Sequence, residues 1–150
     1  MSASLALVIL GPALAVSVVT DLRERRILNA VTYPALLLAV VAAAWTGLVG
    51  QALLGALICA GPLAAAMWRG WMGAGDVKLM AVTGLLAGAA GGWPLCLAVL
   101  FDVAVAGGVL ALAFICAARI RRQPPPRHVP YAVAIAAGAA WALWAGTPIS

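Results

Sequence analysis

The longest uncharged run of the chain constrains its fold more than any other feature. Residues 27–68 are 42 consecutive positions without a charged side chain. As one α-helix this run would measure about 63 Å, roughly twice the ~30 Å hydrocarbon core of a bilayer. The run therefore predicts two membrane-spanning helices joined by a turn. We place the turn at residues 46–51, because Gly47 and Gly50 lie there.

The rest of the chain divides in the same way. Residues 79–118 carry one charge, Asp102, and contain the helix-breaking sequence GGWP at 91–94, so they predict two further spans. The apolar runs at 5–20 and 129–145 predict one span each. No basic residue precedes the first run, so we expect a retained helix there and not a signal peptide. Glycines at 84, 88 and 92 repeat every fourth residue and predict close helix packing.

These runs predict an all-α integral membrane protein, with residues 1–150 forming a single domain built as a polytopic bundle of about six transmembrane helices. A water-soluble globular protein is excluded, because 66% of the residues are hydrophobic and only 9% are charged. The cysteines, Cys59, Cys96 and Cys116, lie in apolar runs at unrelated spacings. We interpret them as small hydrophobic residues, and we expect neither disulfides nor a metal site.

The basic residues predict the orientation of the bundle. All nine Lys and Arg residues lie within residues 21–26, 69–78 and 119–128, and six spans place these three segments on one side of the membrane. Basic loops stay in the cytoplasm, so we expect both termini outside it. Loop retention and anionic lipid account for the net charge of +5. We therefore expect contact with anionic lipid and no binding of nucleic acid.

The same topology brings two carboxylates, Asp21 and Asp76, to one face of the membrane. Two aspartates that share a proton cannot both ionise, so one acts as an acid while the other draws a proton from water. That chemistry hydrolyses a peptide without a metal. Simpler alternatives remain open from the residue types alone. Asp76 can cap a helix, and Asp21 can belong to a solvated basic loop.

The flanking sequences are DLRERRILNAVTYP, from Asp21, and GAGDVKLMAVTGLLAG, from Gly73. They resemble the two signatures of the type IV prepilin leader peptidases, which are membrane aspartic proteases of the GxGD type. A third stretch, HVPYAVAIAAGA from His128, resembles the family's last helix, which usually opens with proline and an aromatic residue. The resemblance covers about residues 5–145. It departs at Leu28, where many members have proline.

The resemblance implies that Asp21 and Asp76 are catalytic and that no cofactor is needed. It also implies a multi-pass protein of the bacterial cytoplasmic (inner) membrane, with its active site at the cytoplasmic face. Prepilins and pseudopilins are the expected substrates, and other pilus-assembly proteins are further candidate partners. Many bifunctional members carry an insert with two CxxC pairs, which this sequence lacks. The chain therefore resembles the short peptidase of tight-adherence (Flp) systems, expected to cleave without N-methylation.

Five further residues are assigned to substrate binding or site support: Gly73, Gly75, Lys78, Arg23 and Asn29. The glycines let backbone approach closely and permit a positive φ, although an ordinary turn explains Gly73 equally well. Lys78 lies about 200° around the helix from Asp76, so we expect an interfacial anchor or substrate contact and not a base. Asn29 suits the N-cap of the second span.

Asp102 is the one charge expected within a span. It lies about 14 Å from the outer end of its helix and about 24 Å from the inner face, so we expect an interhelical hydrogen bond and no contact with the other aspartates. Two other functions remain alternatives. One is a small proton-coupled transporter with Asp102 as carrier and Lys78 as its ionic partner. The other is a non-enzymatic membrane subunit of pilus assembly.

Overall fold

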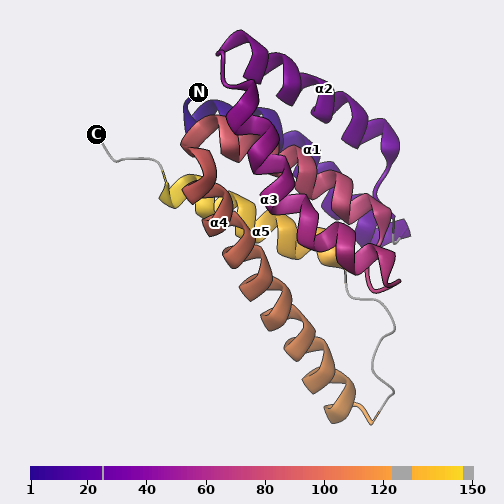
Figure 1. The fold of residues 1–150 in the computed structure, drawn as a ribbon. Coiled ribbons are helices and arrows are strands. Elements are labelled where there is room, and N and C mark those ends of the chain that lie inside the picture. Colours follow the sequence, from indigo (N-terminus) through magenta and orange to yellow (C-terminus); the bar gives the residue numbers. More distant parts are fainter. Residues whose placement is uncertain (25, 123–129, 147–150) are drawn as a thin grey trace.

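The computed structural model describes residues 1–24, 26–122 and 130–146, and the regular elements among them are helices. The helices are α1 (Ala3–Glu24), α2 (Asn29–Trp45), α3 (Val49–Trp68), α4 (Ala74–Ile120) and α5 (Tyr131–Ala145) (Figure 1). The predicted all-α class is confirmed. The turn expected at residues 46–51 lies between Trp45 and Val49. The linker residues 123–129, which include His128, lie outside the described part of the chain.

Helix α4 is interrupted at Gly92, within the predicted break. This residue has φ 68° and ψ −163°, a conformation that glycine adopts far more readily than any residue with a side chain. The second half of α4 turns back from the first half at this point (Figure 1). Pro94 follows in the first turn of the second half, where its missing N–H leaves no helical hydrogen bond unmade. Gly92 therefore serves a chain reversal, and the expectation that it serves helix packing is wrong.

Three helices, α1, α3 and α4, are long and apolar enough to cross a membrane, and α2 and α5 are shorter apolar helices. A straight helix of 47 residues would measure about 70 Å, more than twice the hydrocarbon core, so the break in α4 makes two membrane-length segments of it. The count of six spans stays a prediction.

Glycines bring the helices into backbone contact. A Cβ atom on Gly84 of α4 would meet the carbonyl oxygen of Gly55 on α3, and one on Gly88 would meet the carbonyl oxygen of Gln51. On α5, a Cβ atom on Gly138 would meet the backbone nitrogen of Val103 on α4. Close backbone approach supplies packing energy in lipid, where burial of apolar side chains gives little advantage. The close packing predicted for Gly84 and Gly88 is confirmed.

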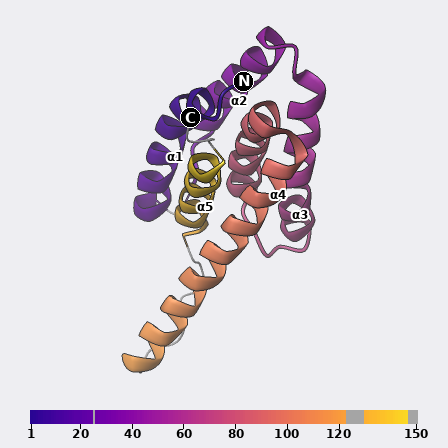
Figure 2. The same cartoon turned by 90° about the vertical axis from the view of Figure 1, so that its left-hand side faces the viewer.

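The second half of α4 extends beyond the bundle (Figures 1 and 2). Its large apolar side chains are exposed there, including Val109, Leu112 and Ile115. Before this extension, the segment packs against α5 at Val103 and Gly107. Gly107 is therefore near the last point at which α4 is held by the bundle.

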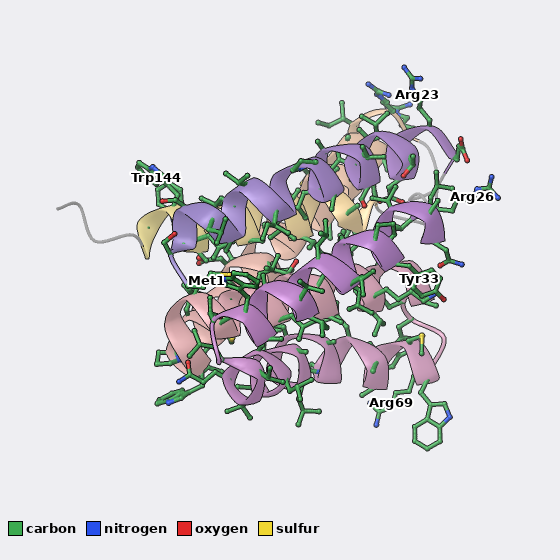
Figure 3. The ribbon with its side chains drawn as sticks, turned by 90° about the horizontal axis from the view of Figure 1, so that it is seen from above. Met1, Arg23, Arg26, Tyr33, Arg69 and Trp144 are labelled. Atoms are coloured by element: carbon green, nitrogen blue, oxygen red, sulfur yellow. The ribbon has the colours of Figure 1, made fainter. Side chains whose placement is uncertain are left out.

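The bundle has two chemically different ends. Arg23, Arg26, Tyr33 and Arg69 lie towards one end, which we call the basic end, while Met1 and Trp144 lie towards the other (Figure 3). The opposite end contains two cavities of about 410 and 550 Å³, which share Met1, Ala90 and Gly91 in their linings. Neither cavity is lined by an aspartate. Which end faces the cytoplasm stays a prediction.

Candidate active site

Asp21 lies near the end of α1 and stabilises the start of a different helix. Its Oδ2 accepts a hydrogen bond from the backbone N–H of Ala132, at 3.1 Å, in the first turn of α5. Pro130, the N-cap of α5, makes no side-chain capping bond of its own. A carboxylate at a helix N-terminus satisfies a free N–H and is stabilised by the helix dipole. Asp21 is half-buried and paired, so the interpretation as part of a solvated loop is wrong.

Asp76 lies in the first turn of α4, before the buried apolar run that starts at Leu79. The N-cap of α4 is Gly73, so Asp76 is not the capping residue. Burial raises the pKa of the Asp76 carboxyl above its ordinary value, to about 6, and the charge of Asp21 adds to this rise, while a backbone hydrogen bond at Gly73 opposes it. This carboxyl therefore holds its proton at a higher pH than an ordinary aspartic acid.

The two carboxylates interact electrostatically, since the charge of Asp21 acts on Asp76. They come from different helices, 55 positions apart in the sequence (76 − 21 = 55). The prediction that they lie at the same end of the bundle is confirmed. Such a pair can keep one carboxyl protonated beside one ionised carboxylate. Within the described residues, no third Asp, Glu, His or Cys joins them in a group able to hold a metal ion.

Lys78 ties the start of α4 to the start of α2. Its Nζ donates hydrogen bonds to Asn29 Oδ1, at 2.8 Å, and to the hydroxyl of Tyr33, at 3.3 Å, and it lies 4.9 Å from the centre of the Tyr33 ring. The N-cap of α2 is Leu28, so the expectation that Asn29 caps this helix is wrong. The Lys78 contacts connect the helix that carries Asp76 to the segment that follows Asp21. This geometry favours the site-supporting role predicted for Lys78 and Asn29.

The glycines of the second motif permit close packing. A Cβ atom on Gly75 would lie 2.8 Å from the Cβ of Ile27, so only glycine lets the start of α4 come this close to the segment before α2. Gly73 has φ −79°, and a Cβ atom there would lie 3.3 Å from Asp76 Oδ2. The positive φ in this loop belongs to Gly70, at 75°, so that expectation for Gly73 and Gly75 is wrong. Arg23 is exposed at the basic end (Figure 3).

Tyr131 is a site residue that the sequence motifs did not indicate. It is the first residue of α5 and precedes Ala132, whose N–H binds Asp21. The charge of Asp76 acts on its hydroxyl. The sequence placed Tyr131 at the start of the last helix, but nothing in the motif shows that this helix begins against both aspartates.

Asp102 is half-buried on the second half of α4, where the backbone of α4 contacts Gly138 of α5. The hydrogen bonds found among the described residues include none to its carboxylate, so the expected interhelical bond is not observed there. Cys59 and Cys96 are buried, Cys116 is exposed, and all three are free thiols.

Comparison with known proteins places this site in a family. Residues 8–112 match the sequence model of the type IV leader peptidase family. The chain belongs to this family. The leader peptidase match contains both Asp21 and Asp76 and ends before Tyr131. No curated protein and no solved structure matches the chain.

Proposed function

We propose that this leader peptidase is a membrane aspartic endopeptidase that removes the N-terminal leader of type IVb (Flp-like) prepilins. The single observation that supports this best is the electrostatic pairing of Asp21 with Asp76 in a chain of this family. Family membership alone gives no mechanism. The pairing supplies one, because hydrolysis by two carboxylates needs an acid and a base at the same peptide bond.

The environments of the two carboxylates assign their roles. Asp21 is held at the N-terminus of α5 by the N–H of Ala132, and we assign it as the base that takes a proton from a water molecule. The water oxygen then bonds to the scissile carbonyl carbon. Asp76, which favours its protonated form, gives its proton to the carbonyl oxygen. When the C–N bond breaks, the departing amine takes up the proton that Asp21 holds, and the hydroxyl proton returns to Asp76 as the new carboxyl group forms.

The substrate of such a site is a membrane helix preceded by a short polar leader. The pair lies at the basic end, where a leader that joins its own membrane helix would emerge at the cytoplasmic boundary. The sequence contains no CxxC pair, and its three cysteines are dispersed over α3 and α4. This supports cleavage without N-methylation.

Co-expression with a prepilin tests the proposal directly. A substrate with a short basic leader ending in glycine, followed by a hydrophobic helix, should lose its leader in cells that make the wild-type protein. The Asp102→Asn variant should process the substrate at a rate within about twofold of wild type, because Asp102 takes no part in the proposed mechanism. Electrophoresis of the substrate gives the ratio of mature to full-length protein. Intact leader in the wild-type cells would contradict the peptidase function.

The transporter alternative makes the opposite prediction, because Asp102 would be its proton carrier. It also needs Lys78 as the ionic partner of Asp102. The observed contacts weigh against it, since Lys78 donates to Asn29 and Tyr33 on α2.

The pH dependence of the reaction should show the titration of Asp76. As the acid, this carboxyl must carry its proton, which it loses as pH rises through about 6. We therefore expect kcat/KM of the purified protein to fall about tenfold for each pH unit above that value. The measurement is leader removal in detergent from about pH 5 to pH 8. A rate that rises throughout this range would reverse the assigned roles.

A further inference from the structure

The first turn of α5 meets both aspartates with different groups. The backbone N–H of Ala132 binds Asp21 Oδ2, at 3.1 Å. The side chain of the preceding residue, Tyr131, is half-buried, and its hydroxyl interacts with the charge of Asp76. Tyr131 therefore lies where α5 meets α1, which carries Asp21, and α4, which carries Asp76.

The Tyr131 hydroxyl is free to form hydrogen bonds with a substrate. Among the described residues, its hydroxyl makes no hydrogen bond, and Tyr33, by contrast, accepts one from Lys78. A phenolic hydroxyl can both donate and accept. One that is half-buried and acted on by the charge of Asp76 is therefore available to a substrate group bound at the aspartates.

Gly107 of α4 fixes the position of the Tyr131 ring. A Cβ atom on Gly107 would lie 2.9 Å from ring Cε2 and 3.1 Å from the hydroxyl oxygen. The shorter distance is below what packed carbon atoms allow, so a methyl group at residue 107 would displace the ring from this position. The adjacent Gly108 faces open space, with nothing within 4 Å of a Cβ atom there. The close contact with the Tyr131 ring is therefore specific to Gly107, and we call Gly107 the seat of the ring.

We propose that Tyr131 is a third catalytic residue, whose hydroxyl donates a hydrogen bond to the carbonyl oxygen of the scissile peptide, and that Gly107 forms its seat. The inference rests on the proposed peptidase function. As the water oxygen adds, negative charge develops on that oxygen until the proton of Asp76 is fully transferred, and a donor aimed at it stabilises this transition state more than the ground state. Tyr131 forms and breaks no covalent bond in this role.

Tyr131→Phe tests the hydroxyl while the ring stays on Gly107. Removal of one such donor costs about 10²-fold in kcat at other hydrolytic sites. We expect kcat for leader removal to fall at least about tenfold, with KM within about threefold of wild type. The control is the folded state, so Tyr131→Phe should accumulate in the membrane as wild type does. Any smaller fall in kcat, or a change in KM alone, overturns the role of Tyr131.

Gly107→Ala tests the seat. The added methyl group displaces the ring, so kcat should fall at least about tenfold, whereas Gly108→Ala should behave as wild type. In the Tyr131→Phe background, Gly107→Ala should lower kcat less than about threefold further, because the hydroxyl that it displaces is already absent. Equal effects of Gly107→Ala in the two backgrounds overturn the proposal. If the wild-type protein itself leaves the leader intact, the proposed function fails, and that result is distinct from failure of Tyr131 alone.

Discussion

Asp21→Asn and Asp76→Asn should each lower the rate of leader removal by about 10²- to 10⁴-fold, the usual contribution of a positioned acid or base. Asparagine keeps the size of the side chain but can neither take a proton from water nor give one to the carbonyl oxygen. Because the two groups act on one proton transfer sequence, the double variant should be little slower than either single variant. The measurement is the initial rate of leader removal with purified protein and substrate.

The control for this prediction is the folded state of each variant. In Asp21→Asn, the new amide oxygen can still accept the N–H of Ala132, and asparagine is among the best capping residues, so α5 should remain in place. Both variants should therefore accumulate in the membrane as wild type does. A variant that accumulates normally and still processes prepilin at more than about a tenth of the wild-type rate would remove that aspartate from the mechanism.

Asp76→Asn should also change how stability depends on pH. The folded-state pKa of Asp76 is raised to about 6, so between about pH 4 and pH 6 the folded protein binds more protons at this site than the unfolded chain. The free energy of unfolding of the wild type therefore falls as pH rises through this window, and the loss persists above it. The variant lacks this contribution. At pH 7 the wild type carries the destabilising effect of the ionised Asp76, and the variant does not. The variant should therefore be at least as stable as wild type at pH 7, and its inactivity would not reflect a loss of stability.

The sequence predicted the helical class, the break in α4 and the pairing of Asp21 with Asp76, because uncharged run lengths and basic loops determine which ends of spans meet. It did not predict the cap on α5. That contact joins Asp21 to Ala132, 111 positions later, and a hydrogen bond between a carboxylate and a backbone N–H leaves no side-chain pattern at the donor. The sequence also predicted the wrong role for Asn29. Its residue type suits a helix cap, but its side-chain oxygen accepts a hydrogen bond from Lys78 instead.

The glycine repeat shows the same limit. Gly84 and Gly92 are equivalent in a four-residue pattern, yet one touches the backbone of α3 and the other reverses the chain. Their difference arises from Pro94, which favours a new helix start, and from the length of α4, which exceeds one span. Periodicity identifies a face of a helix only while the helix continues.

Gly84→Ala should destabilise the bundle strongly, because it adds a methyl group where two helix backbones touch. The new Cβ atom would meet the carbonyl oxygen of Gly55 and lie 2.8 Å from the Cβ of Cys59, so α3 and α4 must move apart. Overpacking of this kind costs about 1–3 kcal/mol, and more where backbone is the obstacle. The free energy of unfolding in detergent, measured by denaturant titration, should fall by at least about 2 kcal/mol.

Gly61→Ala is the matched control, since Gly61 lies on α3 with nothing within 4 Å of a Cβ atom. Alanine favours the helix there by up to about 1 kcal/mol, so this variant should be as stable as wild type or more so. The contact at Gly84 is reciprocal, because a Cβ atom on Gly55 would meet the carbonyl oxygen of Gly84. Once one alanine has separated the helices, the second costs less, so the Gly55→Ala and Gly84→Ala losses should not add in the double variant. Additive losses would mean that the two glycines are constrained separately and that the helices do not cross at this point.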